Sequence, residues 1–401
     1  MPDPHPCNTL SSQTAIPALF MRGGTSRGAF FHASDLPPET SMRDSVLVSA
    51  MGSPHPLQVD GLGGGNPLTS KVGIVSASDD PDVDLDFTFA QLQPDETSVQ
   101  TKANCGNMLS AVVPFAIETG LISPQGTTTT ATVKTLNTNL VAEITVSTPQ
   151  LPDSSRRTVE YEGETTIDGV NGSGSPISIL FRDTAGSIAP GLLPTGNRTD
   201  TLTRQDGGGI DATLIDSGQP AVVIRASDLG VRGDETPEEL SENVELKKGL
   251  EHLRLQAGPL MGLGDVTDKS YPKMTLVSSS SSGAALNTRS FIPHTVHQSI
   301  GVLAALTIAT AACMDGTVAA TVSQPGSGPE RKLLIEHPSG VFPVEMRLDG
   351  DEVVRSGLVR TARTLMAGSV FVPRSVWARP ASPTETASVH SKQAQTEGIH
   401  P

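Results

Sequence analysis

The sequence is poor in three kinds of residue, and each shortage excludes a class of protein. Only 3% of its 401 residues are aromatic, only three are cysteines, and 28 basic residues stand against 43 acidic ones. Few aromatic rings leave little to stack on single-stranded bases, and a net charge of −15 repels nucleic acid and anionic membrane surfaces. We therefore expect no nucleic-acid partner and no membrane partner. Any anionic ligand must be held by local groups.

Cysteine is too scarce and too scattered to build a structural framework. The cysteines stand at positions 7, 105 and 313, which fits neither a disulfide scaffold nor a zinc cluster. No H-E-x-x-H, C-x-x-C or EF-hand pattern occurs, so we expect no bound metal. The sequence also lacks a signal-like start and any apolar run long enough to span a bilayer, and we expect a cytoplasmic protein.

Turn-forming residues are plentiful, and between them lie many short runs typical of strands. The chain contains 39 glycines and 31 prolines, and 36% of its residues are hydrophobic, which is enough for a sizeable core. Residues 84–89 alternate polar and apolar side chains, as a half-buried strand does. Similar runs occur in both halves of the chain. The pattern predicts a strand-rich α/β (α+β) protein.

Three segments have helical character. Apolar residues at helical spacing predict a helix over 104–121 that stops at Gly120, and Pro114 predicts a kink or a broken hydrogen bond within it. Residues 300–313 are apolar on nearly every face, so this helix must be surrounded by protein. The charged segment 235–258 is typical of a surface helix. Each half of the chain therefore has strands, one buried helix, and strands again.

This repeated order indicates two similar domains. We place their junction within 185–205, a segment dense in turn formers, which gives an N-terminal domain over 15–190 and a C-terminal domain over 191–375. Residues 1–14 and 376–401 hold little to bury, and we expect two disordered tails. Both buried helices should begin near the cleft between the domains, where their free N–H groups attract carboxylates.

Cys105 is the first candidate for chemistry. It stands in Asn104-Cys-Gly-Asn-Met108 at the start of the first buried helix, where the helix dipole and free N–H groups favour a reactive thiol. A small core residue is the alternative, because free cysteine is often buried. The polar and small residues around Cys105 favour chemistry. We interpret Cys7, in the tail, and Cys313, in the apolar helix, as inert.

Lys71 is the second candidate. It follows a glycine-rich loop and enters an apolar strand, and a lysine held partly out of water is a candidate base because lost solvation favours the neutral amine. The alternative is a strand-end lysine whose ammonium reaches solvent. The loop fits neither phosphate-binding motif. Gly65 lies six residues before the lysine, and Asn66 stands where a dinucleotide fingerprint needs glycine or alanine.

Two further segments could contact a carboxylate. The run Met21–Gly28 combines glycines, hydroxyls and arginines that suit an anion, although a plain hairpin turn is the alternative. His297 and Ser299 precede the second buried helix and could orient a substrate, although a lone histidine is more often structural. The sequence Ser270-Tyr-Pro-Lys273 matches S-x-x-K without the accompanying K-T-G, and we interpret it as chance.

Five motifs, in this order, resemble the PrpF-like family of methylaconitate and aconitate isomerases. They are MRGGTSRGAFF with a following SDLP, GNPLTSKV, NCGNMLSAVVPFAIETGLI, HPSG and RTARTLMAGSVFVP, and the match covers residues 15–375. That family is similar in fold to diaminopimelate epimerase. The resemblance implies two pseudo-symmetric domains, each a curved, mostly antiparallel sheet wrapped around a central helix, with the active site between them.

The resemblance also implies an activity and assigns residues to it. Members of the family are cofactor-free isomerases that move a C=C bond in small unsaturated tricarboxylates by allylic proton abstraction and return. Lys71 matches the family's catalytic lysine and Cys105 its catalytic cysteine, whereas the second helix begins without the second catalytic cysteine of the epimerases. The candidate substrate-binding residues are Arg22, Gly24, Thr25, Ser26, Asn66, Ser70, Asn104, Gly106, Asn107, Met108, His297 and Ser299.

Three functions are considered, the first two of them implied by the resemblance. The leading expectation is isomerisation of cis-aconitate to trans-aconitate, or of 2-methylaconitate. The alternative is a 4-oxalomesaconate-type keto–enol tautomerase, which needs the same proton-shift machinery. A non-catalytic tricarboxylate-binding accessory protein is an alternative of another class. The expected partner is a small anionic substrate, no cofactor is expected, and a homodimer stays open.

Overall fold

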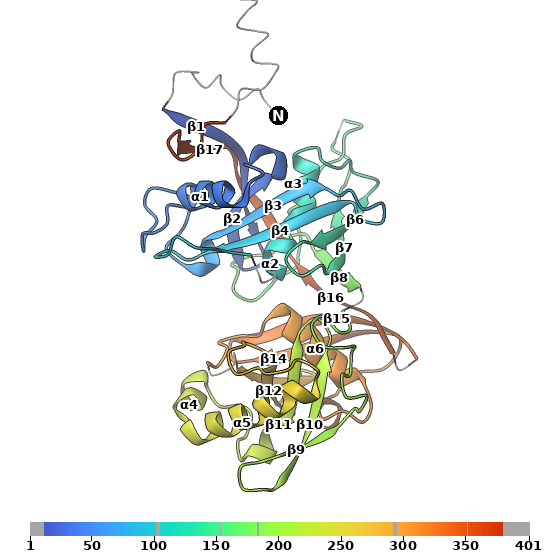
Figure 1. The fold of residues 1–401 in the computed structure, drawn as a ribbon. Helices are drawn as coiled ribbons and strands as arrows, with labels where there is room; N and C mark the ends of the chain where they lie inside the picture. The colour runs from blue at the N-terminus through green and yellow to red at the C-terminus, as the bar shows by residue number, and fades with distance from the viewer. Residues whose placement is uncertain are drawn as a thin grey trace, which may run out of the picture.

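The computed structural model describes residues 12–101, 105–152, 154–182, 184–291, 295–350 and 352–379. It is an α+β structure in which a mixed, mostly antiparallel set of strands is accompanied by few helices (Figure 1). No helix in the described ranges is long and apolar enough to cross a membrane.

The strands and helices have the following bounds. The first half of the chain contains β1 (Gln13–Gly23), β2 (Ser26–His32), β3 (Lys71–Ala77), β4 (Leu85–Leu92), β5 (Val99–Gln100), β6 (Thr128–Thr135), β7 (Val141–Ser147) and β8 (Ile177–Arg182). The second half contains β9 (Asp200–Thr203), β10 (Gly209–Asp216), β11 (Pro220–Arg225), β12 (Lys273–Ser278), β13 (Leu286–Phe291), β14 (Glu330–His337), β15 (Gly340–Asp349), β16 (Glu352–Arg360) and β17 (Ala362–Pro373). The α-helices are α1 (Thr40–Met51), α2 (Gly106–Leu109), α3 (Val112–Glu118), α4 (Pro237–Glu242), α5 (Val244–Leu260) and α6 (Val302–Cys313).

The two halves repeat one succession of strand pairings. In the first half, antiparallel β1–β2 is followed by parallel β2–β3, antiparallel β3–β4, parallel β4–β6, and antiparallel β6–β7 and β7–β8. In the second half, β10–β11, β11–β12, β12–β13, β13–β14, β14–β15 and β15–β16 have the same directions in the same order. Positions in one half therefore have counterparts in the other.

The helices follow the same repeat, because parallel neighbours need a long crossover between them. The first parallel pair is connected through α1 in one half and through α4 and α5 in the other. The second parallel pair is connected through α2 and α3 in one half and through α6 in the other. Thus α6 is the counterpart of α2 and α3.

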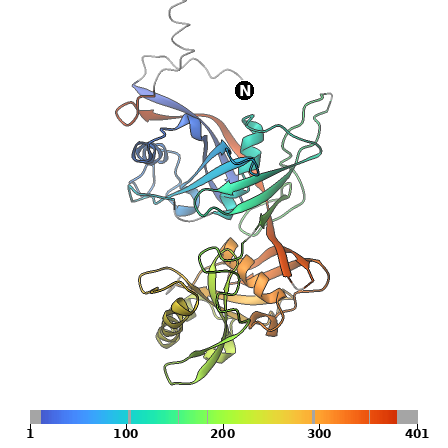
Figure 2. The same cartoon turned by 45° about the vertical axis from the view of Figure 1, so that its right-hand side comes forward.

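The last two strands carry the chain back to the first half. Strand β16 pairs with β15 and also with β8, and β17 pairs antiparallel with β1 along its whole length. Figures 1 and 2 show two bodies that meet at β16. We expected β17 in the C-terminal domain over 191–375, but it completes the first body instead. Pairing between the two ends of a chain leaves no local pattern from which to predict it.

The described part extends slightly past the predicted 15–375. Strand β1 begins at Gln13, and Val376 and Trp377 pack against the apolar cluster that lies beneath α1. The remaining residues of the two predicted tails, 1–11 and 380–401, lie outside the described ranges.

The buried helices lie where the sequence predicts them, but one of them is divided in two. Every residue of α6 from Ala304 to Cys313 is buried, as the apolar run 300–313 predicts. The predicted helix over 104–121 is divided into α2 and α3 at Ser110 and Ala111. This break puts Pro114 in the first turn of α3, where a backbone N–H has no intrahelical partner to lose.

The outer helices cover the other faces of the sheets. The segment predicted as one surface helix is divided at Asn243, whose side chain caps α5 by accepting a hydrogen bond from the Leu246 N–H at 3.0 Å. Helix α1 was not predicted. Its signals are nonetheless local: the Glu39 carboxylate accepts from the first N–H groups, and Gly52 ends the helix with a φ of 78°.

Candidate active site

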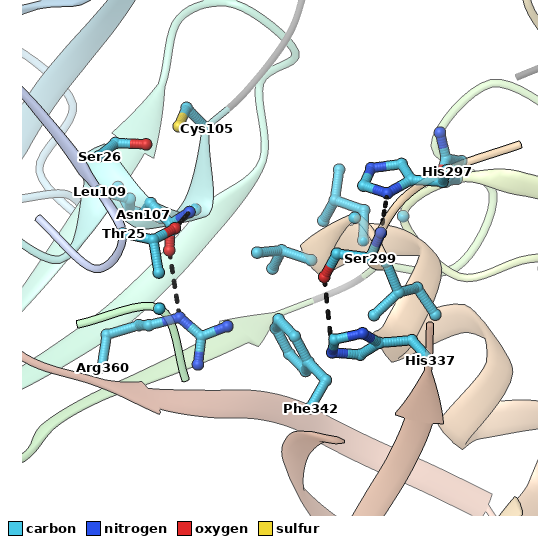
Figure 3. Close-up of a pocket in the computed structure, with 18 of the residues that line it drawn as sticks. Thr25, Ser26, Cys105, Asn107, Leu109, His297, Ser299, His337, Phe342 and Arg360 are labelled. Carbon is cyan, nitrogen blue, oxygen red and sulfur yellow. Dashed lines mark hydrogen bonds between the residues drawn. The ribbon is translucent and has the colours of Figure 1, made fainter. Parts of the chain in front are cut away.

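One cavity lies between the two bodies and contains most of the candidate residues. Its volume is about 1260 Å³, and both halves of the chain line it. Figure 3 shows Thr25, Ser26, Cys105, Asn107 and Arg360 on one side, facing His297, Ser299 and His337 on the other. The predicted position of the site between two similar bodies agrees with this arrangement.

The starts of α2 and α6 meet in this cavity. A Cβ added to Gly106, the first residue of α2, would lie 2.7 Å from Cγ2 of Val302, the first residue of α6. Cys105 is the N-cap of α2 and is a partly buried free cysteine, while the N-cap of α6 is Gly301. Neither N-cap side chain accepts from its helix. The first-turn N–H groups of both helices therefore have no hydrogen-bond partner on their N-cap residue.

Lys71 is held by one well-defined partner. Its buried Nζ donates to Oε1 of Gln91 at 2.6 Å and lies 5.0 Å from the ring centroid of Phe89. Gln91 stands directly opposite Lys71 in the β3–β4 pair. The amide nitrogen of Gln91 donates to three backbone carbonyls, those of Pro67, Ser70 and Leu92, and this fixes Oε1 toward the lysine. Gln91 thus orients the amine at the cavity wall.

Asn107 connects the first hairpin to an arginine from the end of the chain. Its Nδ2 donates to Oγ1 of Thr25 at 3.0 Å, and its Oδ1 accepts from Nε of Arg360 at 3.2 Å (Figure 3). The hairpin approaches so closely that a Cβ at Gly24, whose φ is +52°, would clash with the Asn107 amide. Glycine is therefore required at position 24, although it does not line the cavity.

Arg360 is a buried arginine of the site. Its guanidinium lies 4.2 Å from the ring centroid of Phe342, and Nη1 donates to the Val359 carbonyl at 2.9 Å. Burial lowers the pKa of Arg360 to about 10, and the nearby carboxylate of Asp168 opposes this shift. The side chain is still cationic at neutral pH, so it is suited to a carboxylate ligand.

Two histidines on the second-half side of the cavity are neutral. Nδ1 of His297 accepts from the Ser299 N–H at 2.9 Å, and burial lowers the pKa of His297. Nε2 of His337 lies 3.5 Å from the Ser299 hydroxyl. Burial lowers the pKa of His337 to about 4, and the nearby Asp168 carboxylate opposes this shift only in part. Both rings therefore serve as neutral hydrogen-bonding groups.

Eight of the candidate residues line the cavity, five do not, and one lies outside the described residues. Those that line it are Lys71, Cys105, Thr25, Ser26, Gly106, Asn107, His297 and Ser299. Those that do not are Arg22, Gly24, Asn66, Ser70 and Met108, while Asn104 lies outside the described residues. In the described ranges, no group of three or more histidine, cysteine or acidic residues is placed to hold a metal ion.

The five described residues outside the cavity have structural contacts. Nη1 of Arg22 donates to the carbonyls of Gly24 and Thr361, and Arg22 does not line the cavity. Asn66 caps a short turn, and the Ser70 hydroxyl donates to the Gln58 side chain. Met108 is fully buried in the core.

Gln91, His337 and Arg360 were missed as candidates. His337 opens the HPSG run and Arg360 opens the RTARTL run, so both stand in motifs that the sequence does show. Gln91 can be recognised as the partner of Lys71 only once the β3–β4 register is known.

Comparison with known proteins identifies the family. Residues 13–373 match the family described as PrpF protein. The chain is 45% identical over 368 residues to a 4-oxalomesaconate tautomerase of Pseudomonas putida, which covers 92% of this chain and 99% of the relative. It is 47% identical over 359 residues to a (4E)-oxalomesaconate Delta-isomerase of Novosphingobium sp. strain KA1, which covers 89% and 98%.

A solved structure supports the same assignment. The crystal structure of methylitaconate-delta-isomerase has a TM-score of 0.82 to this chain and is 31% identical, with 93% of this chain and 99% of the other covered. The resemblance drawn from the five motifs is thereby confirmed. The chain belongs to the PrpF family, and, as the names of its relatives show, it is an isomerase.

Proposed function

We propose that the chain catalyses a cofactor-independent allylic proton shift in 4-oxalomesaconate. The observation that carries the proposal is one cavity lined by Lys71, Cys105 and the buried cation Arg360. Two relatives at 45% and 47% identity have oxalomesaconate in their names, while the methylitaconate enzyme is 31% identical. We therefore rank 4-oxalomesaconate ahead of aconitate and 2-methylaconitate, which reverses the order expected from the motifs.

Carboxylates of the substrate bind to Arg360 and to the start of α6. Arg360 is held in place by Asn107 and Phe342, so its charge is fixed before the ligand arrives. Helix α6 has 12 residues, its N-cap Gly301 has no side chain to cap it, and its first residues line the cavity. Its free N–H groups and dipole favour an anion at this end.

Lys71 and Cys105 transfer the proton. A C–H bond next to a C=C bond that is conjugated to a carboxylate or carbonyl is weakly acidic, because the resulting carbanion is delocalised onto oxygen. One of the two groups removes this proton, the electron pair moves along the allylic system, and a proton is returned at its other end. One proton leaves and one returns, so the reaction needs no oxidant, reductant or cofactor.

The contacts of Lys71 suit this role. Oε1 of Gln91 accepts from Nζ of Lys71 at 2.6 Å and so fixes the position of the amine at the cavity wall. Cys105 is the N-cap of α2 and lines the same cavity, which places its thiol beside the bound substrate. Which of the two acts first stays open. The bound carboxylates and Arg360 hold the charge that develops on oxygen.

The test is deuterium incorporation. The protein is incubated in heavy water with 4-oxalomesaconate, 2-methylaconitate and cis-aconitate, and the products are followed by NMR. We expect deuterium at the carbons of the allylic system and the fastest turnover with 4-oxalomesaconate. Binding of these acids without deuterium incorporation would identify an accessory protein and overturn the proposal. Faster turnover of 2-methylaconitate would restore the original order of substrates.

A single substitution tests the assigned base. Lys71→Ala should reduce turnover by a factor of about 10³ or more, because general acid–base groups contribute roughly 10² to 10⁴ each and this variant also leaves a hole at the substrate. Lys134→Ala is the control, since Lys134 does not line the cavity and its Nζ pairs with Asp80 at 3.7 Å. A Lys71→Ala protein that is folded and fully active would eliminate Lys71 from the mechanism.

A further inference from the structure

The internal repeat gives Lys71 a counterpart, Lys273. Lys71 is the first residue of β3, the strand that pairs parallel with the second strand of the first hairpin, opposite Gly28. Lys273 is the first residue of β12, the strand that pairs parallel with the second strand of the corresponding hairpin, opposite Ala221. Both lysines line the same cavity. The S-x-x-K match that we interpreted as chance thus ends on a residue of the site.

The two lysines differ in what holds them. Nζ of Lys71 donates to Gln91, but within the described ranges the Lys273 ammonium makes no hydrogen bond and no ion pair. The two helix starts differ as well, since Gly301 occupies the position that Cys105 occupies in the first half. The second half therefore presents a half-buried cation without an adjacent thiol.

We propose that Lys273 is a substrate-binding residue whose ammonium holds a carboxylate of the bound acid from the second-half side of the cavity. This inference rests on the proposed function, because it needs an anionic substrate in this cavity. A half-buried cation without a partner is unfavourable, and a carboxylate ligand supplies the missing counter-charge. Lys273 thus acts in binding, whereas Lys71 acts in proton transfer.

The electrostatic surroundings of Lys273 are consistent with this role. Burial, together with the positive charge of Arg254, lowers the pKa of Lys273 to about 8. Lys273 in turn contributes to the lowered pKa of His297, so the two groups share one region of the cavity. At neutral pH most of the lysine is still protonated, and a bound carboxylate favours the protonated form.

Other charged groups on the elements around β12 are already paired. On α5, the fully buried Arg254 is bound by the Glu251 carboxylate and by backbone carbonyls. On β11, Arg225 pairs with Asp228 beside the far end of β12. On β13, Arg289 donates to the Glu235 carbonyl and to Asn287. Lys273 is thus the cation near this end of β12 that has no counter-charge among the described residues.

The experiment measures binding without chemistry. Tricarballylate, a saturated tricarboxylate that cannot undergo the allylic shift, is titrated by calorimetry into the wild-type protein and into Lys273→Met and Lys273→Arg, between pH 6 and pH 9. The control is Lys332→Met, which removes an exposed lysine from the rim of the same cavity. Thermal unfolding of each variant verifies that it is folded.

The expected results separate binding from catalysis. At pH 7, Lys273→Met should weaken tricarballylate binding by about 10- to 100-fold, the range for a hydrogen bond to a charged group, and Lys332→Met by less than about twofold. Wild-type affinity should fall as the pH rises past about 8, and Lys273→Arg should lose this fall because arginine stays charged. In turnover assays, Lys273→Met should raise KM far more than it lowers kcat.

Two outcomes would overturn the inference. One is Lys273→Met binding tricarballylate as tightly as the wild type. If Lys273→Met does not fold, the second is Lys273→Arg retaining the same loss of affinity above pH 8 as the wild type. A wild-type protein that neither binds tricarballylate nor turns over any of the three acids would instead overturn the proposed function.

Discussion

The two halves of this molecule have one backbone plan and different side chains at corresponding places. In the first half, Lys71 is fixed by Gln91 and the first helix begins at Cys105. In the second half, Lys273 has no partner among the described residues and the helix begins at Gly301. On the proposed function, the first half supplies the proton-transfer groups Lys71 and Cys105, and the second half supplies the binding groups Lys273, Arg360 and the start of α6.

After loss of Lys71, the largest effect on kcat is expected from loss of Cys105, at the start of the first buried helix. Cys105→Ala should reduce kcat by roughly 10²- to 10³-fold, the contribution of one proton-transfer group, with little change in tricarballylate affinity. Cys313→Ala is the matched control, because Cys313 lies buried in α6. Steady-state kinetics on both variants would check this. Equal activity of Cys105→Ala and wild type would remove the chemical distinction between the halves.

Arg360 connects the halves, and its loss should affect binding. Arg360→Met should raise KM about 10- to 100-fold, because it removes a buried cation from the carboxylate site. Arg363→Met, three residues further along the same motif and exposed, should change KM by less than about twofold. Equal KM values for the two variants would show that the positive charge of this segment matters in general and that Arg360 has no specific role in binding.

The lowered pKa of His337 predicts how the free energy of unfolding changes with pH. Burial lowers its pKa from 6.5 to about 4 in the folded protein. Between these two pH values the imidazole is therefore protonated in the unfolded chain and neutral in the folded chain. The free energy of unfolding should therefore fall as the pH drops from about 6.5 to about 4, by about 3 kcal/mol in total. Urea unfolding of wild type and His337→Asn across this range would measure it. An unchanged slope in His337→Asn would contradict the prediction.

The smallest effect is expected when a capping side chain is introduced at Gly301, the N-cap of α6. Gly301 has φ −71° and ψ 148°, and an added Cβ would meet only Ala304 Cβ at 4.0 Å, so serine fits there. Gly301→Ser should stabilise the protein by a few tenths of a kcal/mol, because its hydroxyl can accept from the first turn of α6. The same hydroxyl competes with a ligand carboxylate and should weaken tricarballylate binding by about threefold. Stronger binding would show that α6 does not hold the anion.

Much of this arrangement is legible in the sequence because it depends on local patterns. The alternation over 84–89 becomes β4, the apolar run 300–313 becomes α6, and the polar loop before Met108 becomes a helix start in the cavity. Lys71 and Cys105 lie in one cavity, as the resemblance implied, although their roles stay a proposal.

What the sequence did not predict depends on long-range pairing. Arg360 reaches the cavity because β16 crosses between the bodies, and Arg22 turns to backbone carbonyls that β17 brings alongside. Lys273 is recognised as the counterpart of Lys71 only from the repeated parallel strand pairings. Periodicity along the chain does not show these pairings. A residue's distance along the sequence says little about which cavity it enters when strands from both ends of the chain pair.

The division between chemistry and binding is tested most directly on one protein, Lys71→Ala. Its affinity for 4-oxalomesaconate and its rate of deuterium incorporation from heavy water are measured side by side. We expect an affinity within about threefold of wild type, since the binding groups of Arg360, Lys273 and α6 are intact, and a deuterium incorporation rate lower by about 10³-fold or more. Incorporation at the wild-type rate would contradict the assignment of proton transfer to the first half.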